Sequence, residues 1–390
     1  MISRSSMLGV FPTKPLGDVV EFLDSIRRPV TESERRTGPY PYYGANGQQG
    51  TIDDFIFDEP LVLLAEDGGH FDDPERGIAY RVSGKTWVNN HAHVLRPNAE
   101  MDLAFLCRVL ENYDVTPWVT GTTRGKLTQA GAAQIVVPVP PLPEQRRIAA
   151  ILDKADELRA KRRAAIAQLD ILTQSIFLDM FGDPATNPKG WPIRTLAQFY
   201  VNQEEGTKCG PFGSALKKSE FESDGVAVWN MDNIDPSGRM VMPFRMWISE
   251  SKYRQLEAYA VANSDVIISR AGTVGKMCVA STGGTRSIIS TNLIRLRFGP
   301  DLLPLYFVSL MTYCKGRIGR LKTGEDGAFT HMNTGILDTL NFPYPPLELQ
   351  ERYATIFQSL EKQKSQHVTQ LAGLNVLVAS LQHRAFRGEL

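Results

Sequence analysis

Three features of the sequence have residue types and spacings that could support chemistry, and the first is a glycine-rich segment. From Arg270 to Met277, glycines and a lysine follow one another in an order that resembles a phosphate-binding P-loop. A P-loop begins with glycine, and its lysine is followed by a serine or threonine that binds magnesium. Arg270 and Met277 occupy these two positions here, so the segment does not indicate nucleotide hydrolysis.

The second feature is a pair of histidines. His91 and His93 have the i, i+2 spacing that places two side chains on one face of a strand. Imidazoles are common zinc ligands, but a zinc site usually needs further histidine, cysteine or carboxylate ligands at recognisable spacings. No such signature accompanies the pair. We predict that these are ordinary core or surface histidines and that the chain has no metal site.

The third feature is the set of possible nucleophiles, and it also gives no catalytic signature. The four cysteines stand far apart, which argues against a disulfide framework and a zinc knuckle and fits a reducing cytoplasm. The sequence has no G-x-S-x-G elbow. Asn187-Pro188 lacks the aromatic continuation of an amino-methyltransferase site, and no carboxylate-carboxylate-lysine nuclease pattern is evident. The sequence predicts a binding protein without catalytic residues.

Local charge points to what is bound. The 390 residues carry 43 Lys and Arg against 43 Asp and Glu, so no global basic field exists. Residues 1–137 sum to −5 and residues 184–342 to +4. In the basic segment, Arg295 and Arg297 share one face of a predicted strand, and a basic ridge on a helix or turn follows, with a solvated charged face as the alternative. The ridge comprises Lys315, Arg317, Arg320 and Lys322, and we predict that Arg295, Arg297, Arg317 and Arg320 bind DNA if the chain is a DNA-binding protein.

An internal duplication divides the chain. Residues 138–147, PVPPLPEQRR, return as PYPPLELQER at 343–352, an offset of 205 that continues without a gap to Phe181 and Phe386. Each copy reads as a proline-rich loop that leads into one long helix, because proline and glutamate suit a first helical turn. We therefore predict four parts: residues 1–137, 138–183, 184–342 and 343–390.

Each long helix has an apolar seam. Its positions alternate in steps of three and four, which is the pattern of a coiled coil. Two such seams in one chain can pair with each other, and an antiparallel pairing brings their polar centres, Arg162 and His367, together. Packing of each helix on its own domain is the alternative. The predicted seam comprises Ile148, Ile151, Leu158, Arg162, Leu169, Leu172, Ile176, Ile356, Leu360, His367, Leu374, Leu377 and Leu381.

The two segments that precede the helices, residues 1–137 and 184–342, look alike. An apolar run ends in glycine at Leu61–Gly69 and again at Val266–Gly275, and an apolar helix-like run precedes each proline-rich loop. We predict an α+β fold with short strands and long loops in both. The chain has 42% hydrophobic residues, enough for two cores, and no run of 18 apolar residues. We expect a soluble protein that is not exported.

These residues support a resemblance to a known family. The order of domain, helix, domain, helix is similar to that of type I restriction-modification specificity subunits. The motifs that carry the resemblance are PPLPEQRRIAAILDKADELRAKR, MFGDPATNPKGWP, PPLELQERYATIF, YPYYGANGQQGTIDDFIFDEPLVLLAEDGG and DVIISRAGTVGK. They span the whole chain. One departure is Leu349, since the second helix lacks the Glu-Gln pair of Glu144-Gln145.

The resemblance implies a non-catalytic, cytoplasmic subunit that binds double-stranded DNA. Each target-recognition domain would read one half of a split, asymmetric target, and the paired helices would dock two modification subunits. S-adenosylmethionine, ATP and magnesium would belong to those modification subunits and to restriction subunits, and this chain would hold no cofactor. Two alternatives are a specificity subunit of a type II system with a fused nuclease-methylase partner, and a coiled-coil adaptor that does not read DNA.

The base-reading side chains should lie in loops. Asn and Gln can pair with adenine, and Arg or Lys with guanine. In the first domain the sequence predicts a DNA-binding loop, with a plain turn as the alternative, and in the second domain it predicts a set in which the two adjacent lysines contact the backbone. The candidates are Asn46, Gln48, Gln49, Arg124 and Lys126, then Lys217, Lys218, Asn230, Asn233, Arg270 and Lys276.

Overall fold

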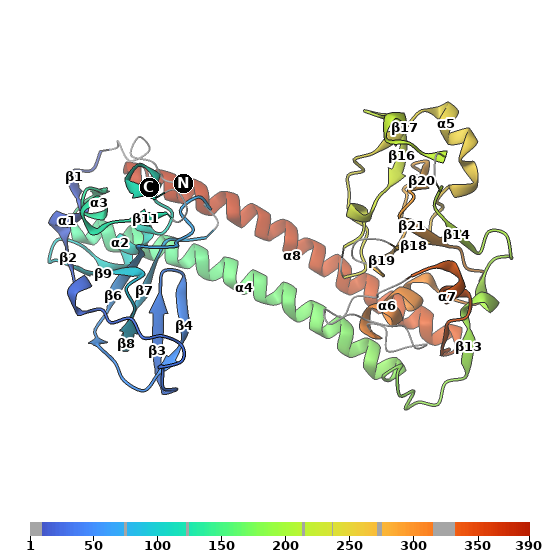
Figure 1. Ribbon diagram of the computed structural model, residues 1–390, viewed down its shortest axis with the longest axis horizontal. Helices are drawn as coiled ribbons and strands as arrows, with labels where there is room; N and C mark the ends of the chain where they lie inside the picture. The colour runs from blue at the N-terminus through green and yellow to red at the C-terminus, as the bar shows by residue number, and fades with distance from the viewer. Residues whose placement is uncertain are drawn as a thin grey trace. The chain divides into compact units, whose positions relative to one another are not determined.

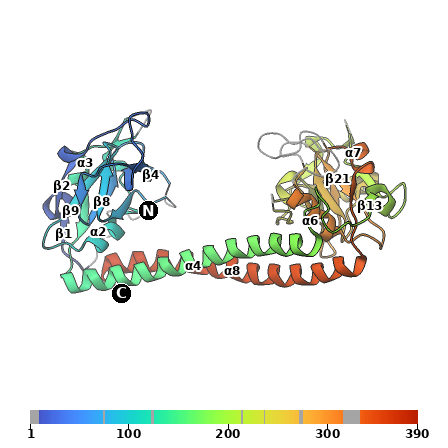
Figure 2. The same cartoon turned by 90° about the horizontal axis from the view of Figure 1, so that it is seen from below.

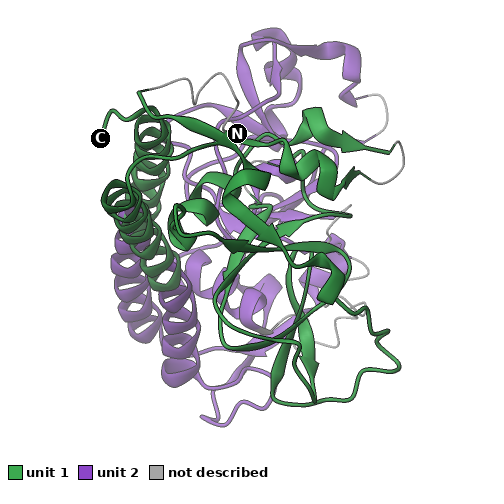
Figure 3. Cartoon of the chain, turned by 90° about the vertical axis from the view of Figure 1, so that its left-hand side faces the viewer, with its two compact units in different colours: residues 1–165, 367–390 green, residues 166–366 purple. Residues whose placement is uncertain are grey.

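The structure is a computed structural model that describes residues 10–73, 76–121, 125–212, 215–235, 237–270, 275–314 and 332–390. The chain divides into two compact units (Figure 3). Unit 1 comprises residues 1–165 and 367–390, and unit 2 comprises residues 166–366. Each unit contains one domain together with part of both long helices.

The domain of unit 1 is built on two four-stranded sheets. One sheet has the antiparallel order β2-β9-β6-β7, and the other has the order β4-β3-β8-β5 with β3 and β8 parallel. All five residues of β6 are buried, because one face packs toward the helices and the other toward the second sheet. The strands and helices are β1 Thr13–Pro15, α1 Leu16–Val19, β2 Val20–Phe22, β3 Tyr40–Gly44, β4 Gly47–Ile52, β5 Phe57–Asp58, β6 Leu61–Ala65, β7 Ala79–Val82, β8 Lys85–Val88, β9 Ala92–Pro97, α2 Leu103–Leu110, β10 Val119–Thr120, β11 Lys126–Leu127, α3 Gln129–Ala133 and β12 Val136–Pro138.

The domain of unit 2 has a closely related topology (Figure 1). Its sheets have the orders β14-β21-β18-β19 and β15-β17-β16-β20, the second again with one parallel pair, β16 with β20. The buried strand β18 corresponds to β6, which confirms the likeness inferred from the two apolar runs. The elements are β13 Ile193–Thr195, β14 Thr207–Cys209, β15 Phe221–Glu222, β16 Val226–Trp229, β17 Trp247–Ile248, α5 Glu250–Gln255, β18 Val266–Ser269, β19 Met277–Val279, β20 Ser287–Ile289, β21 Leu293–Leu296, α6 Pro304–Cys314, α7 Thr334–Asp338 and β22 Asn341–Pro343.

Two long helices follow the domains. α4 spans Leu142–Phe181 and α8 spans Leu347–Arg387, and in each unit the two run side by side in opposite directions (Figures 1 and 2). In unit 1 the Arg162 guanidinium donates a hydrogen bond to Nδ1 of His367. The antiparallel pairing and the meeting of the two polar centres are thereby confirmed.

The ends of the helices complete the hydrophobic cores. In unit 1, Ile148 of α4 and Phe386 of α8 are buried beside β6 and α2. In unit 2, Phe177 and Phe181 of α4 and Tyr353 of α8 are buried against α6. Among the described helices, α4 has a stretch long and apolar enough to pass as a membrane span by length and composition. That measure is weak evidence, and the packing of Phe177 and Phe181 in a core accounts for part of the apolar content.

Four of the predicted seam residues do not lie in a closed seam. Leu158, Leu172, Ile356 and Leu377 are 37–49% exposed. Thr173 and Val378, which correspond to each other in the duplication, are in contrast only 4% exposed. A straight helix has 3.6 residues per turn, so a stripe with a spacing of 3.5 drifts around it by about 20° per heptad. The seam prediction was therefore wrong at these four positions.

A buried glutamine joins each domain to its helix. In unit 1, Gln145 donates to the carbonyls of Glu100 and Pro140 and accepts from the Asp102 backbone N–H, at 2.7–2.8 Å. In unit 2, Gln350 donates to the Pro345 carbonyl and accepts from the Leu303 backbone N–H, both at 3.0 Å. Both side chains are fully buried. The second helix thus keeps the glutamine, and Leu349 changes only the residue before it.

Arginine–carboxylate ion pairs also connect each domain to the long helices. In unit 1, Arg81 and Arg108 both reach Asp153 of α4, at 2.9 and 2.7 Å. In unit 2, Arg239 reaches Glu361 of α8 at 2.6 Å and Asp170 of α4 at 3.1 Å. Burial opposes ionisation of Asp170, but the neighbouring Lys364 and Arg239 outweigh it, and the pKa of this carboxyl is lowered.

Candidate nucleic-acid interface

The three amide candidates of the first domain share one hairpin. β3 and β4 pair antiparallel with an irregular register after Tyr42, and Asn46 lies in the turn between them. Asn46, Gln48 and Gln49 are exposed. The Nδ2 group of Asn46 donates to the Gly68 carbonyl at 3.0 Å, and Nε2 of Gln48 donates to the Gly50 carbonyl at 3.1 Å. The hairpin therefore holds polar side chains at the surface, and the hydrogen bonds to backbone carbonyls orient the amides of Asn46 and Gln48.

A lysine candidate lies next to this turn. The Gly68 backbone N–H donates to the Gly125 carbonyl, and Lys126 follows in β11, which places it beside the loop that Asn46 contacts. The Lys126 ammonium lies 3.2 Å from Glu66 and is 50% exposed. The structure thus brings Asn46 and Lys126 to one surface. Arg124 lies outside the described residues.

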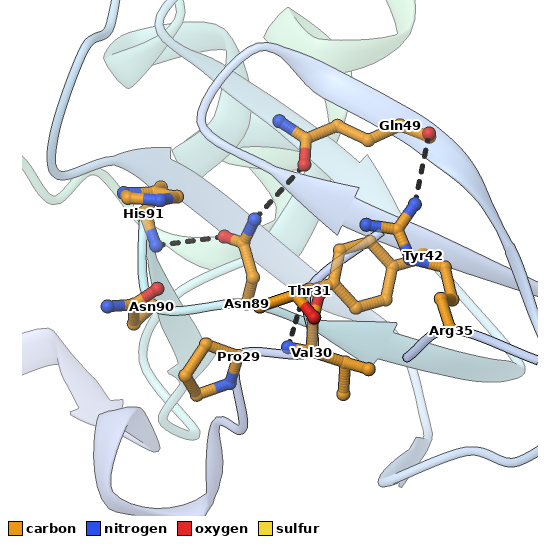
Figure 4. A pocket seen from close by; sticks show the side chains of 9 residues that line it. All are labelled: Pro29, Val30, Thr31, Arg35, Tyr42, Gln49, Asn89, Asn90 and His91. Atoms are coloured by element: carbon orange, nitrogen blue, oxygen red, sulfur yellow. Dashed lines mark hydrogen bonds between the residues drawn. The ribbon is translucent and has the colours of Figure 1, made fainter. Parts of the chain in front are cut away.

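A cavity lined by polar and apolar side chains opens beside the hairpin. It has a volume of about 350 Å³ and is lined by nine residues from the segments 29–35, 42–49 and 89–91 (Figure 4). Asn89 donates to Oε1 of Gln49 at 3.1 Å, and the Arg35 guanidinium lies 3.8 Å above the Tyr42 ring. Sequence reasoning missed Asn89 and Arg35. The one available signal was that Asn89-Asn90 is a polar pair directly after an apolar strand.

In the second domain, two basic candidates meet at the end of a hairpin. Arg270 follows β18 and Lys276 precedes β19, and the Ser269 backbone N–H donates to the Lys276 carbonyl at 2.8 Å. The Arg270 guanidinium lies 4.8 Å from the centre of the Phe212 ring, and Phe212 is 56% exposed. An arginine on an exposed aromatic ring suits contact with nucleic acid.

The adjacent lysines and the two asparagines have different environments. Lys217 and Lys218 are exposed at the start of a short 3-10 helix. Asn230 and Asn233 instead close the 3-10 turn Met231–Asn233: Asn230 accepts from the Met231 backbone N–H, and Asn233 accepts from that of Asn230 and donates to the Val241 carbonyl. Asn233 is 4% exposed. The prediction that Asn233 reads bases is corrected, because its amide is buried and bonded within the fold, and Asn230 already uses its oxygen there.

The strand arginines also serve the fold. Arg295 is 1% exposed and pairs with Glu205 at 2.5 Å, while Arg297 pairs with Asp265 at 2.8 Å and with Glu205 at 3.1 Å. The two share a face, as their spacing predicted, but that face is covered. Burial, together with the neighbouring charge of Arg297, lowers the pKa of Arg295. The prediction that Arg295 contacts phosphate is therefore corrected. Arg297 is likewise engaged within the fold, by its ion pairs with Asp265 and Glu205. Arg317 and Arg320 lie outside the described residues.

The two histidines do not form a joint site. His93 is buried, with Nδ1 2.6 Å from Asp24 and Nε2 2.8 Å from the Leu127 carbonyl, so both ring nitrogens face acceptors. Arg27 bonds Glu66 at 2.5 Å beside them. The group of Asp24, Glu66 and His93 is close enough to hold a metal ion. However, the carboxylates of this group are already bonded to His93 and Arg27. His91 lies elsewhere, with Nδ1 3.4 Å from the Asp67 carboxylate.

Two of the three described thiols are poor nucleophiles. Cys107 and Cys278 are buried, and this burial raises the pKa of each thiol to about 12. A thiol with such a pKa is almost wholly protonated at neutral pH, and the thiolate is the reactive form. The exposed loops of the described residues offer hydrogen-bonding and charged side chains.

Comparison with known proteins identifies the family. The sequence model described as "Type I restriction modification DNA specificity domain" matches twice, over residues 11–168 and 212–373, which is most of the chain. The chain belongs to this specificity-domain family. The first match contains the first domain and more than half of α4, and the second contains most of the second domain and more than half of α8, in agreement with the duplication.

Relatives of the specificity family match over nearly their whole length. A putative type I restriction enzyme specificity subunit of Haemophilus influenzae is 25% identical over 89% of this chain and 87% of its own. The type I restriction enzyme MjaVIII specificity subunit of Methanocaldococcus jannaschii is 20% identical over 89% and 85%. The crystal structure of a type I restriction-modification system S subunit from M. genitalium has a TM-score of 0.62 at 14% identity, and covers 97% of this chain and 96% of that chain. The likeness to that structure supports the fold.

Proposed function

We propose that this chain is the DNA sequence-specificity subunit of a type I restriction-modification complex. The observation that carries the proposal is the double family match on two domains of the same topology, each followed by a long helix. The exposed loops of the two domains carry different residues, so each domain would read its own half of a split, asymmetric DNA target. Catalysis would belong to partner subunits, and this chain would contribute recognition alone.

The long helices would set the spacing between the half-sites. α4 is one continuous helix of 40 residues, about 60 Å at 1.5 Å per residue. Its two ends lie in the cores of different units, through Ile148 and Phe177. Half-sites one helical turn of DNA apart are separated by about 34 Å. A spacer of this length is sufficient for such a target.

Repeated apolar residues on the helices support two docking sites for modification subunits. Ile171 and Leu172 in unit 2 are 65% and 45% exposed, and Val376 and Leu377 in unit 1 are 72% and 49% exposed. The second pair follows the first at the offset of the duplication. Because large apolar side chains exposed next to each other often mark interaction surfaces, each pair would lie in an interface with one partner.

The partners would supply the cofactors. S-adenosylmethionine would be bound by the modification subunits, and ATP and magnesium by restriction subunits, all in the cytoplasm. The matched specificity relatives are named as type I enzymes, which favours this assignment over a type II specificity subunit. The exposed amides and the Arg270–Phe212 pair favour a DNA reader over a pure oligomerisation adaptor.

The decisive experiment is methylome sequencing of the host with and without this gene. We expect one bipartite motif to lose its methylation when the gene is deleted and to regain it upon complementation. A methylome that does not change while the partner methyltransferase is expressed would refute the proposal.

A residue-level variant tests the division of labour. Replacing Asn46 and Gln48 by alanine should relax or abolish recognition of one half-site, at roughly 1 to 3 kcal/mol for each lost bidentate pair. The other half-site serves as the internal control. Equal losses at both half-sites would contradict the assignment of one half-site to each domain.

A further inference from the structure

The exposed hairpin contains one amide whose orientation the fold determines through another side chain. Asn89 is 4% exposed and accepts a hydrogen bond from the His91 backbone N–H at 2.8 Å. A backbone N–H can only donate, so the oxygen of the Asn89 amide must face it. The Nδ2 group of Asn89 is thereby directed to Gln49, whose Oε1 lies 3.1 Å away.

The same relation fixes Gln49. Since Asn89 presents a donor, the partner atom on Gln49 must be its oxygen, and the nitrogen points away from Asn89 (Figure 4). Amide orientations are usually ambiguous, but here the chain of bonds begins at a backbone group whose polarity is certain. The Gln49 backbone is also held, because Arg35 donates to its carbonyl at 3.3 Å.

A glycine makes room for this pair. A Cβ atom at Gly44 would lie 2.5 Å from Nε2 and 2.6 Å from Cδ of Gln49, and 2.9 Å from Nδ2 of Asn89. Any side chain at position 44 would therefore displace the Gln49 amide. The Gly44 carbonyl in turn accepts a hydrogen bond from the Tyr80 hydroxyl, which keeps this backbone close to the pair.

We propose that Asn89 is a positioning residue that makes Gln49 a hydrogen-bond donor toward a base edge with acceptors only. This inference rests on the proposed DNA-reading function. Because its oxygen is directed to the buried Asn89, Gln49 does not present its oxygen and nitrogen side by side, as the bidentate pair with adenine requires. The N–H groups that it turns away from Asn89 suit guanine O6 and N7 or thymine O4. Asn46 and Gln48 differ, since their bonds to backbone carbonyls use one N–H and leave their oxygens free.

Two substitutions reverse the polarity of this group. Gln49→Glu still accepts from Asn89 but presents an oxygen outward. Asn89→Asp still accepts from the His91 N–H, but its second oxygen now needs a donor, so the Gln49 amide must turn and present its own oxygen. Both variants should change the preferred base at one position of one half-site toward cytosine or adenine, which offer amino donors, with a loss of about 10-fold or more for the original base.

The test uses the full-length chain in its complex with partner methyltransferase subunits, on a randomised double-stranded DNA library and by methylome mapping. Asn89→Asp should have no further effect in a Gln49→Ala background, because its action passes through Gln49. Gly44→Ala, whose Cβ would displace the Gln49 amide and also press on the Asn89 amide, should weaken the same position. The thermal unfolding midpoint of each variant is measured in parallel.

The outcomes separate the two proposals. If wild-type complex selects no DNA sequence, the proposed function fails. If wild type selects a motif and folded Asn89→Asp selects the same motif with the same affinity, the positioning role is refuted. Uniform weakening on all sequences without a change in base preference would assign Gln49 to a phosphate and would also overturn the inference.

Discussion

The repeated apolar pairs on the two helices make the docking proposal quantitatively testable. The perturbation is Ile171→Gln with Leu172→Gln in one variant, and Val376→Gln with Leu377→Gln in the other. Glutamine keeps helix propensity and adds no charge. If each pair is covered by one modification subunit, each variant should weaken the binding of one of the two copies.

The size of the effect follows from the exposed fractions. Burial of a whole Val, Leu or Ile side chain contributes about 1.5 to 3 kcal/mol. Ile171 is 65% exposed and Leu172 45% exposed, so covering both contributes about 2 to 3 kcal/mol. Val376 and Leu377, at 72% and 49%, give nearly the same value. The dissociation constant for one partner should therefore rise by about 30- to 150-fold in either variant.

Native mass spectrometry of the co-expressed complex, titrated over concentration, measures this directly. Wild type should give two modification subunits per chain, each double variant should give one at concentrations between the two affinities, and the quadruple variant should give none. Circular dichroism and thermal unfolding serve as folding controls. A folded double variant that retains both partners with unchanged affinity would refute the reasoning, and so would a wild-type ratio of one to one at saturating partner.

Three further predictions concern the spacer and the cores. Deleting residues 160–163 removes about one turn of helix, ~6 Å, so methylome mapping should show a half-site gap changed by one or two base pairs with the half-sites retained; an active variant with the same gap would show that the helices do not set the spacing. Arg295→Ala should lower the free energy of unfolding by about 1 to 3 kcal/mol, because it removes a buried guanidinium that donates to the Ala260 and Glu205 carbonyls, while Arg297 still pairs with the Glu205 carboxylate; weakened DNA binding at unchanged stability would restore the phosphate role. Burial opposes ionisation of Asp24, but His93 and Arg27 outweigh it and its pKa is lowered, so the stability that this carboxylate contributes is present above about pH 4 and is lost as the pH falls through the lowered value. Urea unfolding measured at a series of pH values should therefore show that Asp24→Asn reduces the fall in unfolding free energy below about pH 4. An unchanged fall would contradict this role of Asp24.

The sequence predicted those parts of the fold that repeat. An exact offset of 205 between two proline-rich loops was enough to infer the helix pair, and the meeting of Arg162 with His367 followed from the antiparallel choice. Strands β6 and β18 were visible as apolar runs because both of their faces are covered, as the burial of every residue in them shows. Such features depend on periodicity and composition, which a single sequence records.

The side chains of the candidate interface were harder to predict. A period of two correctly placed Arg295 and Arg297 on one face, but periodicity does not say what covers that face, and Glu205 is 90 residues away. Likewise an asparagine that caps a turn, such as Asn233, has the same residue type as one that reads a base. Asn89 was missed because its role depends on a contact with Gln49, which is distant in sequence. Only the tertiary arrangement of loops distinguishes these cases.

Under the proposed function, the repeated contacts between domain and helix would allow the DNA target to change while the partner subunits stay bound. Gln145 and Gln350 each donate to a proline carbonyl five residues earlier and accept from the backbone directly before α2 or α6. These contacts lie within the part of each domain that packs on the helices, whereas Gln49 and Arg270 lie on hairpins away from them. A substitution in a hairpin loop therefore leaves the contacts between domain and helix intact, and the exposed pairs on the helices keep their positions. In the proposed function, recognition and docking would in this way be separated along each copy of the repeat, and the base preference of one half-site would vary independently of the other and of the partner subunits.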